Sequence, residues 1–542
     1  SVRDGLSLLD QAIAHSGAGG VDEDQLRAML GLVDQFRGLE QAVRDNSARR
    51  RERFHERGQL LPRERIALLL DRGTPFVELS TLAGYKMHDD DGGKNIAGGC
   101  NIVGIGYVSG TRCMISASDS GITGGAITPM GLVKNLRAYK IALENKLPLI
   151  NLIESAGANL LYQAEIFVDG GKIFASLARL SAAGVPVITI VHGSSTAGGA
   201  YMPGMSDYVI AVRNRARIFL GGPPLVKAAT GEDVSADDLG GADVHSSISG
   251  TADYAVDSEQ EGIALVREIV GIFEKPAKAA VDRREPEEPY YDPDELYGII
   301  PDDVKKQFDM REVIARIVDG SRFHEFKPDY GPTVICGFAY IYGWKVGIIG
   351  NNGVIFSDSA QKATQFMQTC NRDRIPIIFL QNTTGFMVGK DYEHGGITKD
   401  GAKMLMVQTN LDVPKLTIMT NGSFGAGNYA MCGRAYDARF LFSWPNSQIS
   451  VMGMEQAAKT LTQIRLKALE RQGKTLSEEE ERNIYASITQ DYIEKSSAYY
   501  STSELWDDGI IEPADTRKVL GISLSVALNR EFSETPHGIL RI

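Results

Sequence analysis

The sequence predicts an α/β protein of two tandem domains that share one fold, preceded by a helical N-terminal arm. Three observations predict it: residues that recur at a constant offset, short apolar runs that alternate with longer helical stretches, and two equivalent glycine-rich loops. The repeat is far longer than the roughly 20 to 50 residues of a solenoid unit, so duplication of a whole domain explains it best.

The repeat keeps a strict spacing over much of the chain. Five residues recur with the same type 228 positions later, namely Pro148, Gly157, Pro186, Gly199 and Tyr201 as Pro376, Gly385, Pro414, Gly427 and Tyr429. Upstream, IVGIGYVSGTR at 102–112 matches ICGFAYIYGWK at 335–345 at an offset of 233. A length difference of five residues must therefore lie between the two matches.

Residues 1–60 are expected to form the helical arm. LRAMLGLVDQF has helical apolar spacing, and a GAGG break stands at 17–20. An arginine cluster interleaved with Glu52 and Glu56 follows, at Arg49, Arg50, Arg51, Arg53 and Arg57. The cluster fits either a solvated, internally ion-paired helix or a surface near a phosphate-bearing ligand.

The first α/β domain is expected over 61–275 and the second over 301–542. The apolar runs LPLINLI, VPVITIV, IPIIFL and VPKLTIM are typical of strands buried on both faces, and helical stretches lie between them. A segment rich in proline and charge, without periodicity, predicts a linker over 276–300. Near the end, TLSEEEERNIYASITQDYIEKSSAYY predicts a charged, solvated helix.

Composition limits the classes of partner. The net charge of −12 weighs against a nucleic-acid partner, because most of this surface would repel phosphates. Five cysteines occur without CxxC pairs, which favours a reducing compartment over a disulfide framework. The sequence contains no apolar stretch long enough for a bilayer and no signal or transit pattern. We expect a cytoplasmic protein, or a mitochondrial matrix protein if a leader has been removed.

Each half carries a glycine-rich loop directly after a buried-strand pattern, AGGAY at 197–201 and GAGNY at 425–429. A strand-to-helix turn built of glycine leaves backbone N–H groups unpaired and lets a ligand approach without Cβ interference. Such a turn can bind an oxyanion, and two of them suit a reaction in which both substrates develop negative charge on a carbonyl oxygen. The alternative is that these small residues serve close packing.

Other kinds of site fit poorly. The loops are neither a P-loop nor a dinucleotide fingerprint, and STAGG is not the GxSxG elbow of a serine hydrolase. Ser194, Ser195 and Thr196 are therefore expected to shape the turn. The eight histidines show no metal spacing, and His192 is expected to be a core residue. Backbone donors remain, and removing one oxyanion-hole donor typically costs about 3 to 4 kcal/mol of barrier.

At these residues the chain resembles the carboxyltransferase (β) subunits of biotin-dependent acyl-CoA carboxylases. The resemblance runs from RGQLLPRERIALLLD at 57 to WDDGIIEPADTR at 506. Its motifs include SAGANL at 155, STAGGAYMPGMSD at 195 and QNTTGFMVG at 381. GPPLVKAATGE and FGAGNYAMCGRAYD make the chain most similar to the 3-methylcrotonyl-CoA and geranyl-CoA carboxylase branch.

The resemblance implies two crotonase-like domains, the first for acyl-CoA and the second for biotin. The amides of Gly198 and Gly199 would stabilise the enolate of the acyl thioester, and those of Gly425, Ala426 and Gly427 would hold the ureido oxygen of carboxybiotin. Loss of CO2 would leave a biotin nitrogen that takes the acyl proton before the enolate attacks CO2. For a branched 2-enoyl thioester the enolate is conjugated, so carboxylation can occur at the γ carbon.

The same resemblance implies further contacts to the acyl-CoA substrate. They are expected from Ala156, Gly157, Ala158, Ala175, Ala200, Tyr201, Arg57 and Arg63. The arginines of this set and Arg65 would lie near the CoA phosphates, with a structural ion-pair role as the open alternative.

Two departures from the family pattern concern the substrate. SAGAN has Ala156 where many relatives have glycine, which adds a methyl group among the CoA contacts. GGKIFASLARLS at 170–181 differs from the Phe-rich version of 3-methylcrotonyl-CoA enzymes, and the small Ala175 would enlarge the acyl pocket toward a geranyl chain.

The resemblance also implies partners. The sequence holds no ATP-binding biotin carboxylase region and no AMKM biotinylation site, so biotin is expected on a separate α subunit. Family members form β hexamers within α6β6 complexes, in which the first domain of one subunit faces the second domain of another, so an isolated monomer should be inactive. We expect no nucleic-acid partner, no membrane partner and no bound metal.

Rival functions remain open. A crotonase-type hydratase would need carboxylates beside the thioester and a single domain, so the duplication disfavours it. A biotin-dependent acyl-CoA decarboxylase would run the transfer in reverse, and other acyl-CoA carboxylase specificities are possible. A noncatalytic scaffold would tolerate Cβ atoms in the loops, where glycines are intact in both halves.

Overall fold

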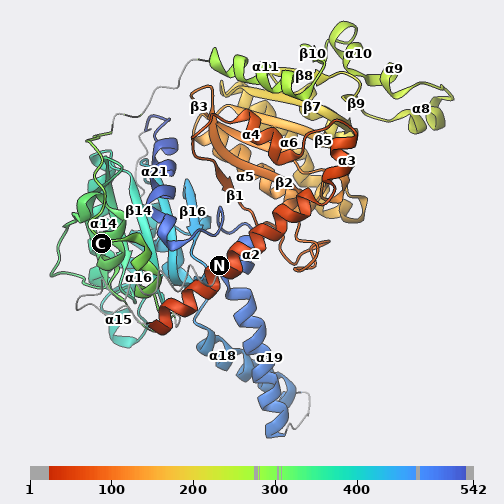
Figure 1. Cartoon of the computed structure of the whole chain (residues 1–542). Coiled ribbons are helices and arrows are strands. Elements are labelled where there is room, and N and C mark those ends of the chain that lie inside the picture. Colours follow the sequence, from red (N-terminus) through yellow and green to blue (C-terminus); the bar gives the residue numbers. More distant parts are fainter. Residues whose placement is uncertain are drawn as a thin grey trace. The chain divides into compact units, whose positions relative to one another are not determined.

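The computed structural model describes residues 23–273, 279, 281–301, 304, 306, 308–471 and 477–532 (Figure 1). The chain divides into two compact units. We call Gly38–Lys278 with Ser503–Leu505 the first unit, and Ser1–Arg37, Ala279–Thr502 and Trp506–Ile542 the second unit. The GAGG break expected at 17–20 lies outside the described residues.

The first unit is built on one large sheet. In spatial order its strands are β1 (Val77–Leu79), β2 (Asn101–Val108), β3 (Thr111–Ser118), β5 (Leu149–Ser155), β7 (Val187–Thr196), β8 (Tyr208–Val212) and β10 (Tyr254–Val256), and β9 (Arg217–Phe219) also pairs with β7. The pairs among β1, β2 and β3 are antiparallel, and the other pairs are parallel. A small parallel pair joins β4 (Ala126–Ile127) to β6 (Gly157–Ala158).

The second unit repeats this sheet. Its strands are β11 (His324–Glu325), β12 (Val334–Ile341), β13 (Trp344–Asn351), β14 (Ile377–Thr383), β15 (Lys415–Phe424) and β16 (Phe440–Ser443), with β17 (Gln448–Ser450) paired to β15. The pairs among β11, β12 and β13 are antiparallel and the rest are parallel, as in the first unit. The prediction of two α/β domains with one fold is confirmed.

The strand bounds locate the five-residue length difference of the repeat. β2 and β3 begin 233 positions before β12 and β13, whereas β5 and β7 begin 228 positions before β14 and β15. The offset changes between β3 and α5 (Pro129–Glu144), which are joined by residues 119–128. In the second unit the matching connection, between β13 and α14 (Ser357–Arg372), is residues 352–356. The longer connection of the first unit contains β4.

Helices cover both faces of each sheet. The first unit has α3 (Arg51–Glu56), α4 (Pro62–Leu69), α5, α6 (Gln163–Ala182), α7 (Tyr201–Gly204), α8 (Pro223–Thr230), α9 (Ala236–Gly240), α10 (Ala242–Ser247) and α11 (Glu259–Gly271). Residues of α4 and α11 pack on the even-numbered side chains of β5 and β7, such as Ile150 and Ile190. The opposite, odd-numbered face therefore belongs to α5 and α6.

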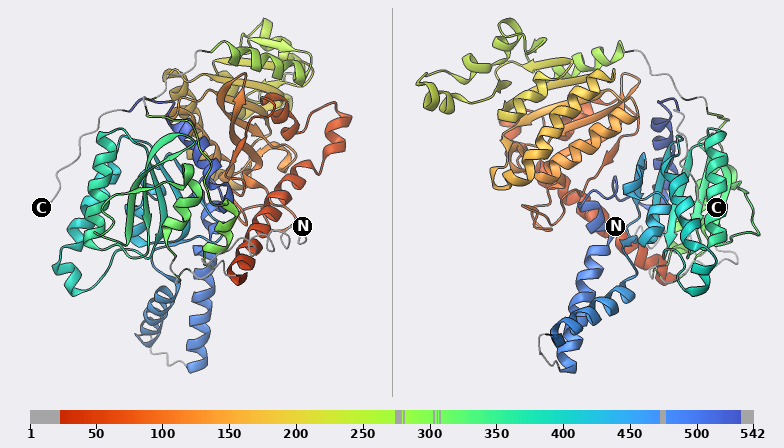
Figure 2. Two further views of the ribbon diagram at one scale, coloured as in Figure 1. Left: turned by 60° about the vertical axis from the view of Figure 1, so that its left-hand side comes forward. Right: turned by 180° about the vertical axis from the view of Figure 1, so that it is seen from behind.

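The second unit has a matching layer and an added hairpin. Its helices are α12 (Leu296–Ile299), α13 (Met310–Ile317), α14, α15 (Lys390–His394), α16 (Ile397–Thr409), α17 (Gly425–Ala430), α18 (Met454–Arg471), α19 (Glu478–Ser496), α20 (Ala498–Ser503) and α21 (Thr516–Ala527). α18 and α19 run side by side and project away from the second sheet (Figure 2). The helix expected in the charged segment is α19, which Ser477 and Glu480 begin with a capping box.

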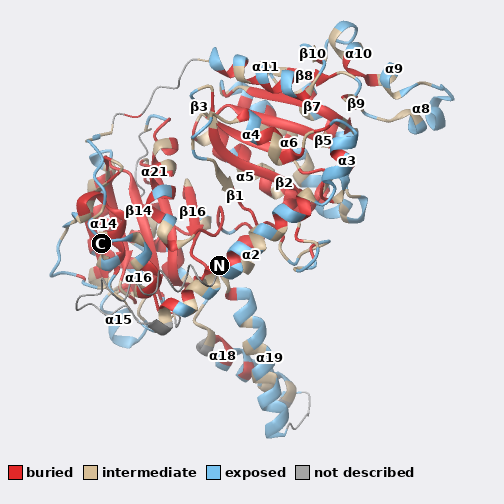
Figure 3. Ribbon diagram, in the orientation of Figure 1, coloured by how far each residue is buried: buried red, intermediate tan, exposed pale blue. Residues whose placement is uncertain are grey.

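The arm and the linker also contain helices. α2 (Glu23–Ala48) contributes residues to both units, and α3 follows it, so the described part of the expected arm is helical. Within the expected linker 276–300, the structure places a turn of 3-10 helix at Pro293–Glu295 and then α12. The strands of both sheets are the most buried parts of the described chain (Figure 3).

A buried carboxyl group in the second unit makes stability depend on pH. Asp507 is fully buried, and burial raises its pKa to about 6 even though the Ser443 hydroxyl donates to it at 2.6 Å. The folded state thus holds this proton more tightly than the unfolded chain. Protonated Asp507 therefore contributes to the free energy of unfolding. This contribution is fully present below about pH 4 and is lost as the pH rises through 6, which lowers the free energy of unfolding by about 3 kcal/mol.

We therefore expect Asp507→Asn to stabilise the protein at neutral pH. The melting temperature of the variant should equal that of the wild type near pH 4 and exceed it by a growing margin up to pH 7. Thermal melts at intervals of half a pH unit measure this margin. A difference in melting temperature that does not change with pH would contradict the raised pKa of Asp507.

Candidate active site

β7 and β15 end in the same sharp turn. Ala197 directly follows β7 with φ +55°, and Gly425 directly follows β15 with φ +56°. The left-handed conformation costs an L-residue such as alanine about 1 kcal/mol or more, so packing imposes this turn on the first unit. A short helix begins at each turn, 3-10 at Ala197–Ala200 and α17 at Gly425.

These turns contain all the residues predicted to act through their amides. Gly198, Gly199, Gly425, Ala426 and Gly427 all lie in the first turn of a helix, where an N–H has no earlier carbonyl acceptor within the helix. Gly198 and Ala426, at equivalent positions, are exposed, and Gly199 and Gly427 are buried. Each unit therefore brings its amides to an accessible turn at the end of a central strand.

Glycine is required by close approach inside each turn. A Cβ on Gly199 would lie 3.2 Å from Oγ of Ser155. A Cβ on Gly427 would lie 2.9 Å from Cα of Gly385 and 3.0 Å from Thr383. The first contact is tight and the second cannot form without movement of the backbone, so the packing alternative and the ligand-binding hypothesis both require glycine here.

Beside each turn, a hydroxyl group at the end of the neighbouring strand accepts a hydrogen bond from the glycine two residues further along the chain. Gly157 donates its N–H to Oγ of Ser155 at 3.1 Å, and Gly385 donates to Oγ1 of Thr383 at 3.1 Å. Both glycines have positive φ, +88° and +111°. The strand pairing shifts register just before each hydroxyl residue, between Ile153 and Ser155 and at the matching place in β14. The duplication thus extends to the fine geometry of the site.

The other predicted acyl-CoA contacts surround the first turn. Ala156 and Ala158 are exposed, and the N–H of Ala156 donates to the carbonyl of Gly125 at 3.1 Å. Ala200 is buried, whereas the side chain of Tyr201 is 48% exposed. These residues lie at the ends of β5 and β7, next to each other in the sheet.

Ala175 lies on α6, which faces the same turn. The ring of its neighbour Phe174 meets the ring of Tyr201 edge-on, with centroids 5.5 Å apart, and a Cβ on Gly198 would lie 3.5 Å from Phe174. Ala175 is partly buried. The structure therefore places α6 beside the amides of the first unit.

The predicted phosphate-binding arginines have different surroundings. Arg63 makes two hydrogen bonds to the Glu78 carboxylate, at 2.8 and 2.9 Å, and Arg65 makes two to Glu259, at 2.7 and 3.2 Å. Arg65 is 1% exposed and Glu259 is 3% exposed. Arg57 has an exposed side chain. The geometry supports the ion-pair alternative for the first two arginines.

His192 is a core residue on the opposite face of the sheet from the turn. It is buried, and its Nδ1 lies 3.9 Å from Oε2 of Glu154. Burial, and then the charge of Arg65, hold the pKa of the imidazole well below its usual value. His192 is therefore neutral at pH 7, as the prediction of a core histidine requires.

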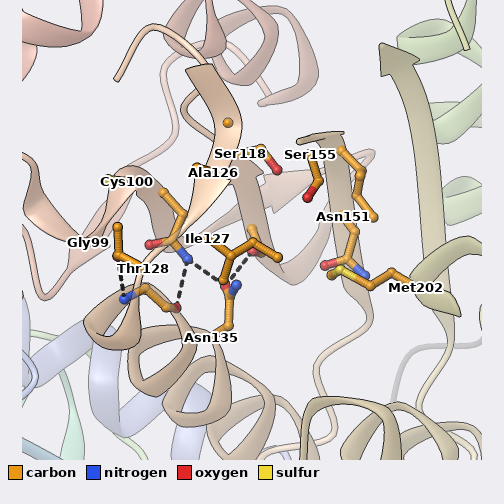
Figure 4. Close-up of a pocket in the computed structure, with 15 residues that line it drawn as sticks. Gly99, Cys100, Ser118, Ala126, Ile127, Thr128, Asn135, Asn151, Ser155 and Met202 are labelled. Carbon is orange, nitrogen blue, oxygen red and sulfur yellow. Dashed lines mark hydrogen bonds between the residues drawn. The ribbon is translucent and has the colours of Figure 1, made fainter. Parts of the chain in front are cut away.

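A polar cavity of about 40 Å³ lies beneath the turn of the first unit (Figure 4). Three asparagines line it, Asn101, Asn135 and Asn151. Asn101 donates to Oδ1 of Asn135 at 2.7 Å, and Ser116 donates to the same oxygen at 2.9 Å. The cavity is large enough to hold water and reaches Ser155, which lies against Gly199 of the turn.

The second unit fills the same place with apolar side chains. Val334, Ala363 and Phe379 stand where the first unit has its three asparagines, and all three belong to the core cluster around β12–β15. The cavity was not predicted from the sequence. A comparison of the two halves position by position could have found it, because the fold itself does not require polar residues there.

The described part of the chain shows no group of three or more His, Cys, Asp or Glu side chains that could hold a metal ion. Among the same residues no helix is both long and apolar enough to cross a membrane. The five cysteines are free and buried.

Comparison with known proteins gives consistent matches. The family model for the carboxyl transferase domain matches residues 53–539. The probable methylcrotonoyl-CoA carboxylase beta chain, mitochondrial, of Drosophila melanogaster is 49% identical over 540 residues, which covers 96% of this chain and 93% of that protein. The biotin-dependent 3-methylcrotonyl-coenzyme A carboxylase beta1 subunit of Mycobacterium tuberculosis is 48% identical, with 93% and 95% covered.

One solved structure has the same architecture over nearly its whole length. The beta subunit of geranyl-CoA carboxylase from P. aeruginosa superposes with a TM-score of 0.87 at 47% identity, which covers 97% of this chain and 99% of that chain. A match of this extent takes in the sheets of both units.

Proposed function

This chain belongs to the carboxyl transferase family as a β subunit of a biotin-dependent acyl-CoA carboxylase, and from that premise we propose its substrate, its partners and the roles of its residues. The reaction moves CO2 from carboxybiotin to an acyl-CoA. The acyl group is a branched 2-enoyl group, 3-methylcrotonyl or geranyl, carboxylated at the γ carbon. The names of the relatives support both chain lengths.

The observation that carries the residue roles is the pair of equivalent turns. The amides of Gly198 and Gly199 stabilise the enolate oxygen of the thioester, and those at Gly425, Ala426 and Gly427 bind the ureido oxygen of biotin. Fixed N–H donors are worth most in a dry site, because they need no reorganisation as charge develops. The absence of a Cβ at Gly199 and Gly427, both tightly enclosed, fits this use of the backbone.

Carboxybiotin supplies the CO2 and, once CO2 has left, a nitrogen that can accept the acyl proton. Because the biotin nitrogen takes the proton, the reaction needs no side-chain base. His192 would be unsuited to that role, since it is buried, neutral and on the other face of the sheet. Ala156, Gly157 and Ala158, in the segment that follows β5 and includes β6, line the thioester, and Tyr201 covers it from α7.

The partners follow from the same proposal. Biotin is carried by a separate α subunit with biotin carboxylase activity, and the β subunits form a hexamer within an α6β6 complex. Large side chains at equivalent positions are exposed in both units: Leu160 at 77% and Val388 at 73%, Tyr201 at 48% and Tyr429 at 46%. Contact between the first domain of one subunit and the second domain of another would bury these side chains.

We place the domain boundaries at 61–275 for the acyl-CoA domain and 301–542 for the biotin domain, joined by the linker 276–300. In a bacterium the protein would work in the cytoplasm, and in a eukaryote in the mitochondrial matrix.

The direct test combines the protein with a biotinylated α subunit, ATP, labelled bicarbonate and a panel of acyl-CoAs. We expect label in 3-methylcrotonyl-CoA or geranyl-CoA, and much less in acetyl-CoA and propionyl-CoA. Label in none of them would reject the carboxylase activity. Replacing Ala175 by phenylalanine should favour 3-methylcrotonyl-CoA over geranyl-CoA, and equal loss with both would remove Ala175 from the acyl pocket.

A further inference from the structure

Three buried polar side chains connect β14 to α17 in the second unit. Oε1 of Gln381 accepts a short hydrogen bond from the Ser423 hydroxyl and a longer one, at 3.3 Å, from Nδ2 of Asn428. Asn428 also donates to Oγ of Ser423 at 2.8 Å. Gln381 and Ser423 are fully buried, and Asn428 is 6% exposed.

Gln381 also reaches the far end of α17. Its Nε2 donates to the carbonyl of Met431, the residue after the helix, at 2.7 Å. Asn428 lies within the helix, and a Cβ on Gly433 would overlap its Oδ1, so glycine at 433 leaves room for this side chain. One glutamine thus bonds to the middle of α17 through Asn428 and to its end through Met431.

The first unit forms the equivalent turn without these amides. Ile153 and Ala200 occupy the positions of Gln381 and Asn428, and both are buried. The serine is retained, but Oγ of Ser195 donates to the carbonyl of Gly199 at 2.9 Å instead. Folding of the turn therefore does not require the amide pair. Burying two side-chain amides costs free energy, which their hydrogen bonds offset.

We propose that Gln381 and Asn428 are positioning residues for the biotin side of the reaction. They hold α17 so that the amides at Gly425–Gly427 point at the ureido oxygen. The inference rests on the proposed function. The effect is expected to be large, because an oxyanion donor acts at about 2.7 to 3.1 Å and a displacement of about 1 Å can cost about 100-fold in rate.

The first unit supplies the test substitutions. Gln381→Ile and Asn428→Ala, alone and together, give the second unit the residues that the same turn already contains in the first. The assay follows transfer of the carboxyl group from the carboxylated acyl-CoA product to free biotin by the purified β hexamer. It yields separate KM values for biotin and for the acyl-CoA.

We expect kcat/KM for free biotin to fall by about tenfold to a hundredfold in the joint variant, with KM for the acyl-CoA within about twofold of the wild type. Thr364→Ala is the matched control, because it removes a buried hydroxyl that bonds to the Ala360 carbonyl within α14. This control should leave both KM values unchanged.

A rise of similar size in the KM values for biotin and for the acyl-CoA, or a lower melting temperature with unchanged kinetics, would overturn the positioning role. If the joint variant does not assemble, Gln381→Glu retains the acceptor for Ser423 and Asn428 and loses the donor to Met431. In this variant kcat/KM for free biotin should fall by a smaller factor while KM for the acyl-CoA stays near the wild-type value, and an unchanged kcat/KM for free biotin would count against the proposal. A wild-type protein that transfers nothing to biotin would instead refute the proposed function itself.

Discussion

Gly427→Ala is expected to lower kcat for carboxyl transfer by about 100-fold to 1,000-fold, the usual effect of losing one oxyanion-hole donor. The added methyl carbon would lie 2.9 Å from Cα of Gly385 and 3.0 Å from Thr383. Neither neighbour is the flexible end of a side chain, so the turn itself must move. Its N–H groups then no longer point at the position of the oxyanion.

The measurement is steady-state carboxylation with the assembled enzyme, together with gel filtration to verify that the variant assembles as the wild type does. Gly453→Ala is the control, because a Cβ at Gly453 meets nothing within 4 Å. It should leave kcat unchanged. A Gly427→Ala enzyme with near-normal kcat would remove this turn from the mechanism.

Gly199→Val makes the matching change in the first unit. Even one carbon would lie 3.2 Å from Oγ of Ser155, and valine adds two more atoms in the same space. We expect turnover to be abolished while the subunits still assemble. Gly204→Ala, five residues further on and with nothing within 4 Å of an added Cβ, is the control for this turn. Near-normal rates for Gly199→Val would exclude the enolate role.

Arg65→Ala is expected to produce the largest loss of stability among the predictions, about 3 to 5 kcal/mol. It leaves the Glu259 carboxylate buried at 3% exposure without its counter-charge. The thermal melt should shift down by many degrees. Because both hydrogen bonds of this pair are internal, KM for the acyl-CoA should change little in the protein that remains folded.

A double substitution separates charge from packing. Adding Glu259→Gln to Arg65→Met removes the uncompensated charge, and the side-chain amide oxygen that replaces the carboxylate can still accept from the N–H of Leu60, so most of the lost stability should return. The exposed pair Arg372–Asp373 is the control, and Arg372→Ala should leave the melting temperature almost unchanged. A rise in KM for the acyl-CoA with unchanged stability would restore the phosphate-binding role of Arg65.

Spacing along the chain was enough to predict the duplicated fold. The offsets of 228 and 233 match the starts of four pairs of strands, and the five-residue difference falls in one connection. The two turns were predicted for the same reason, because a glycine-rich loop after a buried strand is a local pattern. Spacing could not show that Ser155 and Thr383 lie against Gly199 and Gly427 from the neighbouring strand, since that contact depends on register between distant segments.

By itself, then, the sequence determined the number of domains, their common fold, the position of the two turns and the family. These properties depend on periodicity and motifs that are local along the chain. Only the tertiary structure decided that Arg65 pairs with Glu259, that one unit has a polar cavity where the other has a core, and that Gln381 supports α17. Each of these depends on which side chains meet after packing. Arg65 and Glu259 are 194 residues apart, and no local pattern encodes a contact across that distance.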